Sequence, residues 1–296
     1  MSTVDPRILR AQKAAKAQSS PSSWGITAIV AVVHVALWAL AGFGIASQED
    51  VFRLMSVNPV TAWDSPFEND FWMIFVGVFP AAWLGFYLSS RLRLYLSALS
   101  AGIAPFATAF LGLAVGTGLF FPNWTRAENV GFTAGFGDDA PNVQWDGGAW
   151  ISYYEPYWLP AVFVVVFVVG LILVVRFNHS AQEKQARILG VVENGTRAIG
   201  QVSEANSGTV WVNNSPLVSL TVAYKDLNGE QRWVTKRQVF TPTHIPRAGD
   251  TFTVWYDQND PGNQKKIALA AGDVSTAKVE EAIRPADPAD SAADLS

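Results

Sequence analysis

The side chains best suited to chemistry in this sequence are three histidines, because the chain contains no cysteine. His34 lies in the middle of residues 24–45, an apolar stretch long enough to cross a membrane. An ionisable side chain at that depth is a candidate haem ligand or proton relay, and both roles need a partner. His34 is expected roughly 15 Å deeper than the membrane edge where His179 falls, and His244 lies outside the spans. We therefore predict a neutral His34 that binds no cofactor and hydrogen-bonds a neighbouring helix.

No motif in the sequence indicates a catalytic class. G-x-S-x-G, H-E-x-x-H and Walker patterns are absent. The candidate acids lie in acidic loops with no histidine on the same predicted side of the membrane. One loop, residues 122–157, contains Asp138, Asp139 and Asp146, but their spacing does not match an EF-hand. The sequence therefore predicts a protein that is not an enzyme and that holds no metal or cofactor.

Four apolar stretches without Asp, Glu, Lys or Arg determine the expected architecture. They are residues 24–45, 71–88, 94–121 and 158–175. Each is at or near the roughly 20 residues that a helix needs to cross about 30 Å of hydrocarbon. A composition of 50% hydrophobic and 16% charged residues also favours a membrane protein. We predict a membrane α-helical bundle of four transmembrane helices in residues 24–177, preceded by a basic N-terminal segment, residues 1–23.

The distribution of charge predicts the orientation of these helices. Basic residues occur before the first span, between the second and third, and after the fourth: Arg7, Arg10, Lys13, Lys16, Arg91, Arg93, Arg176, Lys184 and Arg187. The connections 46–70 and 122–157 are mainly acidic. By the positive-inside rule, both termini are expected in the cytoplasm. The chain is thus predicted to be a multi-pass protein of the plasma membrane.

Two prolines and a glycine pair are the notable residues within the spans. Pro80 and Pro105 fall near the middle of the second and third spans, where proline removes a helical hydrogen bond and favours a kink. Kinked helices can form a midplane binding site, as in some transporters. Gly112 and Gly116 form a G-x-x-x-G pair that allows close helix approach. We predict that this pair packs within the chain, with homo-oligomerisation as the alternative.

A small soluble domain of β-strands is predicted after the spans. Residues 178–189 are expected to form a juxtamembrane helix or linker, residues 190–271 the β domain, and residues 272–296 a disordered acidic tail. A turn is predicted at Ser207–Gly208. The expected strands are 198–206, 209–212, 218–224, 231–239, 251–256 and 266–269. About six short strands favour an all-β, barrel- or sandwich-like domain.

The β region resembles a known bacterial family. The resemblance rests on Leu189-Gly190, Asn194-Gly195, Ala198 to Val202, Pro216, Asn228-Gly229, Gly249-Asp250, Val254 to Asp257 and Asp260-Pro261. These residues are similar to the domain-of-unknown-function family 3592, which often occurs beside membrane helices in actinobacteria. That family usually has proline after the first aspartate of its closing pattern, where this chain has Gln258. The resemblance implies an envelope-associated bacterial protein and assigns no reaction and no catalytic residue.

Basic residues of the β region are candidate contacts to anionic lipid. The predicted domain is tethered close to the inner membrane surface, and its candidate contacts are Lys236, Arg237, Lys265 and Lys266. Each cation near anionic lipid adds to the free energy of membrane binding. Nucleic acid is not an expected partner, because residues 187–269 hold nine Lys or Arg against seven Asp or Glu.

These features favour a membrane scaffold over a catalyst. The helices would present the β domain at the membrane surface to a protein partner, with membrane lipid as a second partner. The alternative is a carrier of lipid or small molecules that uses the bundle kinked at Pro80 and Pro105.

Overall fold

The structure is a computed structural model that describes residues 21–58, 70–135, 141–212, 215–240 and 242–277. The described residues divide into two compact units, one within Lys16–His179 and the other beginning at Ser180. The first unit contains helices and one short hairpin, and the second contains a β-sheet and the end of a helix. The predicted tail and the N-terminal segment lie almost entirely outside the described residues.

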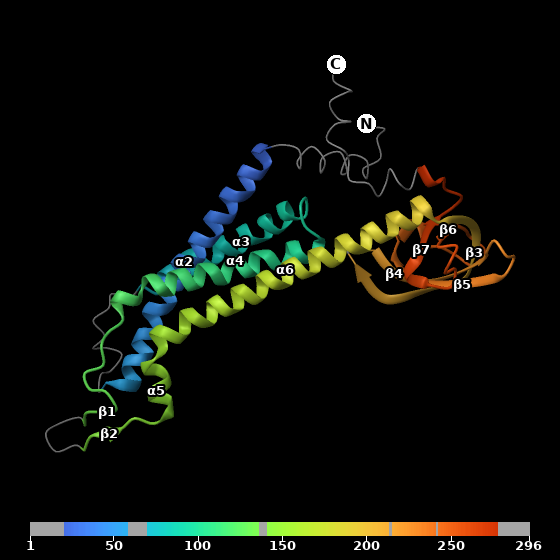
Figure 1. Cartoon of the computed structure of the whole chain (residues 1–296). Coiled ribbons are helices and arrows are strands. Elements are labelled where there is room, and N and C mark those ends of the chain that lie inside the picture. The colour runs from blue at the N-terminus through green and yellow to red at the C-terminus, as the bar shows by residue number, and fades with distance from the viewer. Residues whose placement is uncertain (1–20, 59–69, 136–140, 213–214, 241, 278–296) are drawn as a thin grey trace. The chain divides into compact units, whose positions relative to one another are not determined.

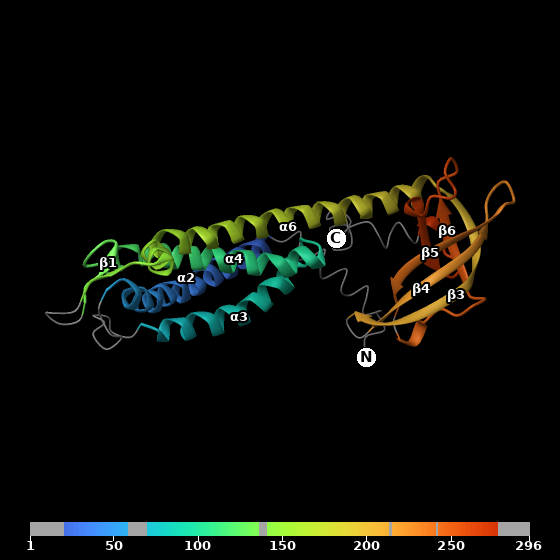
Figure 2. The same cartoon turned by 90° about the horizontal axis from the view of Figure 1, so that it is seen from below.

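Four helices are long and apolar enough to cross a membrane. They are α2 (Pro21–Val57), α3 (Trp72–Leu92), α4 (Ala98–Leu119) and α6 (Glu155–Asn194). Figures 1 and 2 show α2, α3 and α4 running side by side. Large apolar side chains on these helices point outward, including Trp83 at 81% and Phe86 at 79% exposed. Exposed apolar surface of this extent is expected of helices that face lipid.

Glycine allows α2 and α4 to pack in backbone contact. A Cβ atom placed on Gly112 would lie 2.6 Å from the carbonyl oxygen of Val35, and one on Gly116 would lie 2.0 Å from that of Ala39. Gly77 of α3 is equally close to α2. The G-x-x-x-G pair therefore serves a contact within the chain, as small residues commonly do between membrane helices.

Two of the helices extend beyond the predicted spans. The span predicted at 24–45 belongs to α2, which continues to Val57, so the first part of the predicted connection 46–70 is helical. Similarly, α6 runs without interruption through the predicted linker 178–189 and into the predicted β domain. Hydropathy detects only the apolar part of a helix, whereas polar and charged residues with good helix propensity continue it into water.

The connection between α4 and α6 is folded around aromatic side chains. It contains β1 (Phe132–Thr133), β2 (Val143–Gln144) and α5 (Gly147–Tyr153). Asp146 caps α5 by accepting a hydrogen bond of 2.9 Å from the Ala149 amide. Trp145 packs with Ala149 against Val57 at the end of α2. The aromatic residues thus hold this connection against the end of α2.

The second unit is built on one antiparallel sheet of five strands. They are β3 (Thr196–Val212), β4 (Ser215–Lys225), β5 (Gln231–Val239), β6 (Thr251–Tyr256) and β7 (Ile267–Ala271), in the order β5-β4-β3-β6-β7. Alternate residues of β4 are buried along most of its length, including Val218, Leu220 and Val222. Leu220 and Val222 form a core with Phe252 and Val254 of β6.

The sheet differs from the prediction in its strand count and closure. Residues 198–206 and 209–212 form the single long strand β3, with a register shift between Ser207 and Trp211 and no turn at Ser207–Gly208. The sheet is open, because β5 and β7 are both edges. Pairing with β4 keeps β3 extended, and the irregularity is accommodated as a bulge. The domain is therefore a half-barrel, neither closed nor a sandwich.

A buried carboxylate organises the turn between β4 and β5. Asp226 accepts hydrogen bonds of 2.9 and 3.0 Å from the amides of Asn228 and Glu230, and one of 3.1 Å from Arg232 Nε. Burial alone would raise the pKa of Asp226, but these hydrogen bonds outweigh it and hold the pKa below its ordinary value.

The lowered pKa of Asp226 makes the stability of the sheet depend on pH. In the unfolded chain the carboxyl binds its proton at higher pH, so its contribution is complete above about pH 4 and is lost as pH falls through the folded-state pKa. We expect Asp226→Asn to lower the unfolding temperature near neutral pH and to reduce its fall in acid. Calorimetry in detergent measures the unfolding temperature of the parent chain and of Asp226→Asn across this pH range. If the unfolding temperatures of both proteins fall equally steeply with pH, the role of the Asp226 carboxylate is contradicted.

Candidate anion-binding pocket

The second unit contains a cavity of about 480 Å³. It lies between the charged end of α6, from Ser180 to Val192, and the sheet, and both edge strands β5 and β7 contribute to its wall. The end of α6 thus faces the opening that the half-barrel leaves between its edges. The volume falls within the range of about 300 to 1,000 Å³ that is usual for small-molecule sites.

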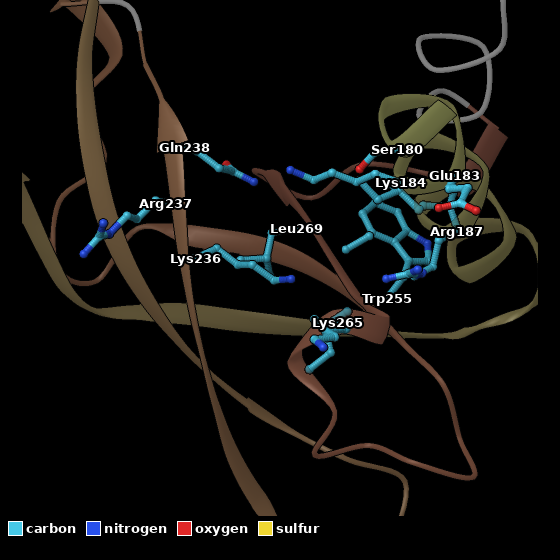
Figure 3. A pocket seen from close by; sticks show the side chains of 14 residues that line it. Ser180, Glu183, Lys184, Arg187, Lys236, Arg237, Gln238, Trp255, Lys265 and Leu269 are labelled. Carbon is cyan, nitrogen blue, oxygen red and sulfur yellow. The ribbon is translucent and has the colours of Figure 1, made fainter. Parts of the chain in front are cut away.

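Cationic side chains from three elements gather around this cavity (Figure 3). Lys184 and Arg187 come from α6, Lys236 from β5, and Lys265 from the short 3₁₀ helix Gln264–Lys266. Glu183 is the acidic member of the lining. Within the described part of the chain, no salt bridge joins any of the four cations to a carboxylate.

Lys236 is the cation most affected by its surroundings. Burial, followed by repulsion from Lys184, lowers the pKa of the Lys236 ammonium group. Its Nζ donates a hydrogen bond to the carbonyl oxygen of Gln264. Two ammonium groups near one cavity repel each other, so an anion that enters between them relieves that repulsion.

The floor of the cavity is apolar. Trp255 of β6 is fully buried and packs with Val192, Ile188 and Ala268, which also line the cavity. Its indole Nε1 donates a hydrogen bond of 3.1 Å to Thr276 Oγ1. Since its side chain is fully buried and its polar atom is satisfied, Trp255 belongs to the packed apolar layer behind the cavity and offers no hydrogen-bond donor to a ligand.

The four residues predicted to contact lipid do not behave alike. Lys236, Arg237 and Lys265 all line the cavity, although the Arg237 side chain points away from the others in Figure 3. Lys266 instead forms an ion pair of 2.8 Å with Asp257, and this pair raises the pKa of the lysine. Lys184 and Arg187 were missing from the predicted set. Their i, i+3 spacing on a helix was the available signal for a shared basic face.

His34 lies at a junction of α2, α3 and α4, apart from this cavity. Its Nε2 accepts a hydrogen bond of 3.2 Å from Trp38 Nε1, and its Nδ1 lies 3.2 Å from Thr108 Oγ1 on α4. A neutral imidazole that accepts at Nε2 carries its proton on Nδ1 and so donates to Thr108. The Thr108 hydroxyl can in turn donate to the carbonyl of Pro105 at 3.0 Å. This chain of bonds gives His34 the helix-bridging position expected from the sequence.

Removing this bridge should weaken the bundle. Thr108→Val keeps the side-chain shape and removes the acceptor of the His34 bond, so we expect a loss of about 1 kcal/mol. His34→Ala should cost more, because the side chain is 1% exposed and leaves a cavity. Thermal unfolding in detergent measures both, and Gly102→Ala, where an added Cβ meets no atom within 4 Å, is the control. Unchanged stability in Thr108→Val would exclude the structural role of the bond.

The two prolines lie within unbroken helices. Pro80 occurs inside α3 and is exposed, whereas Pro105 occurs inside α4 and is buried. Both helices continue past their prolines, since neighbouring groups can satisfy the freed carbonyls in a membrane helix.

The first unit also contains a buried ion pair that the sequence analysis assigned to a loop. Arg53 is 3% and Asp50 0% exposed, and Arg53 Nη2 lies 2.9 Å from Asp50 Oδ1. Arg53 also donates to the carbonyl of Thr125, and its guanidinium lies 5.4 Å from the centre of the Trp124 ring. Asp50 accepts a 3.0 Å hydrogen bond from the Thr125 amide. The pair thereby joins α2 to the connection after α4.

Comparisons with protein-family models, curated proteins and solved structures found no match to this chain. The resemblance of the β region to family 3592 accordingly stays a prediction.

Proposed function

We propose that this chain is a non-enzymatic integral membrane protein that presents a cytoplasmic β domain to a protein partner at the cell membrane. The observation that carries the proposal is the composition of α6. This one helix contains the apolar stretch 158–175 and then a charged part that ends at Asn194. Two apolar residues of the charged part, Ile188 and Val192, pack on the sheet. A membrane-spanning segment and the β unit are thus joined without an irregular linker.

The distribution of basic residues supports the orientation. Arg91 and Arg93 follow the apolar part of α3, and Arg176 and Lys184 follow that of α6. By the positive-inside rule these ends face the cytoplasm, together with the β unit. The carrier alternative draws less support, because α3 and α4 run unbroken through Pro80 and Pro105.

Two experiments test the proposal. A reporter that is active only outside the membrane, fused after residue 296, should remain silent, and activity would contradict the orientation. Purification of the tagged chain in mild detergent, followed by mass spectrometry, should recover a stoichiometric protein that is lost when residues 190–271 are deleted. A specific lipid retained without any protein, and lost in Pro80→Ala or Pro105→Ala, would favour the carrier instead.

A further inference from the structure

We infer that the cavity between the end of α6 and the sheet binds a small ligand that carries a phosphate group. The inference goes beyond the scaffold role and does not depend on it, because every residue that lines the cavity belongs to the unit that begins at Ser180.

The charge around the cavity suits a multiply charged anion. Of the five basic residues in the lining, Arg237 points away from the others in Figure 3. The other four, Lys184, Arg187, Lys236 and Lys265, contribute four positive charges, and Glu183 subtracts one. A single carboxylate would leave most of this charge unneutralised, whereas a phosphate monoester carries about −1.5 to −2 at neutral pH. Arginine adds a planar fork of donors that fits phosphate oxygens, and lysine adds mobile point charges. Phosphate is therefore the anion that this lining fits best.

Two of these cations, Lys184 and Lys236, come from elements that are far apart in the sequence. Lys184 projects from the helix and Lys236 from the sheet, and Figure 3 shows both between these two elements. Burial, and then repulsion from Lys184, lowers the pKa of Lys236. Folding has thus brought together like charges from distant parts of the sequence, and a bound anion would offset the electrostatic cost.

The cavity has room for more than a phosphate, and its floor is apolar. Ile188 and Leu269 are partly exposed and provide apolar surface, and the buried Val192, Trp255 and Ile267 pack behind them. The rest of the ligand would pack on this floor, as is usual in pockets that combine a few polar groups with an apolar lining. A phospholipid headgroup and a soluble phosphate ester share this chemistry, so the experiment must separate them.

The test is calorimetric titration of the full-length chain in neutral detergent micelles with three probes. Dihexanoyl phosphatidic acid and glycerol 3-phosphate share a phosphate monoester, and only the first has acyl chains. Dihexanoyl phosphatidylcholine has the same chains and no net charge. We expect saturable binding of phosphatidic acid that weakens as salt is added, and much weaker binding of phosphatidylcholine.

The variants decide whether binding occurs in this cavity. Lys184→Gln and Lys236→Gln should each weaken phosphate binding by about tenfold or more. The matched control is Lys225→Gln, the same change at an exposed lysine of β4 outside the cavity. Because Lys184 is exposed on α6, its replacement removes no core contact, and unfolding temperatures of all variants provide a check on folding.

Each outcome has a defined meaning. Binding of phosphatidic acid well above that of glycerol 3-phosphate, lost in both pocket variants, supports the inference with a lipid headgroup as the source. Equal binding of both, lost in the same variants, supports it with a soluble phosphate ester. Absence of binding, or binding that Lys225→Gln weakens as much as the pocket variants do, overturns it.

Discussion

Gly116→Ala is expected to lower the unfolding temperature of the detergent-solubilised chain sharply. A Cβ at this position would lie 2.0 Å from the carbonyl oxygen of Ala39 and 2.7 Å from the amide nitrogen of Phe43. Both are backbone atoms of α2, so a rotamer change in α2 cannot relieve the clash. The helices must move apart, and overpacking of this kind costs about 1 to 3 kcal/mol, with larger values where backbone must shift. Loss of the adjoining packing between the two helices adds to that cost.

Gly118→Ala is the matched control for this prediction. It lies two residues further along α4, and an added Cβ there meets no atom within 4 Å. Because alanine favours helix more than glycine does, this variant should be as stable as the parent or slightly more stable. Tryptophan fluorescence during heating can follow all three proteins. If Gly116→Ala and Gly118→Ala unfold at the same temperature, the close contact between α2 and α4 is wrong.

The glycine pair also shows what the sequence could predict about the bundle. Spacing alone predicted close approach of a neighbouring helix at Gly112 and Gly116, and the structure has that contact. Spacing could not identify the neighbour, since α2 and α3 are both apolar and rich in small residues. The contact depends on which backbone lies at the right depth, and that follows from packing of the whole bundle.

The bounds of a strand were predictable where the local sequence signals agree with the pairing of that strand in the sheet. The predicted bounds of β5 and β6 match the structure, because turn residues delimit these strands, as Asp226 to Gly229 do before β5. Strand β3 was divided in error at Ser207–Gly208, a dipeptide typical of turns. Pairing with β4 on one side and β6 on the other stabilises β3, and a local turn signal carries no information on such partners.

The pocket was only partly predictable for a similar reason. Lys236, Arg237 and Lys265 were predicted to contact an anionic lipid surface, and that interaction stays a prediction. Their meeting with Lys184 and Arg187 requires α6 to continue past its apolar stretch and to turn a basic face toward the sheet. The α6 cations are far in sequence from Lys236 and Lys265, and only tertiary packing brings them together, so sequence alone could not predict the pocket.

Arg53→Met is expected to destabilise the first unit by about 3 to 5 kcal/mol, the usual result of removing one partner from a buried ion pair. The variant keeps an unbranched side chain of similar length but leaves Asp50, which is fully buried, without its counter-ion. Glu155 adds to the effect, because it is 7% exposed and interacts electrostatically with Asp50 and Arg53. Loss of Arg53 removes the one cation of this group.

The double variant Asp50→Asn/Arg53→Met separates charge from packing. If the uncompensated Asp50 charge causes most of the loss, the double variant should recover a large part of the stability that Arg53→Met loses. Arg126→Met makes the same chemical change at an exposed arginine of the connection after α4, and it should have little effect. Equal losses in Arg53→Met and the double variant would instead assign the role of Arg53 to its contacts with Thr125 and Trp124. In that case the arginine would act mainly by holding the connection onto α2.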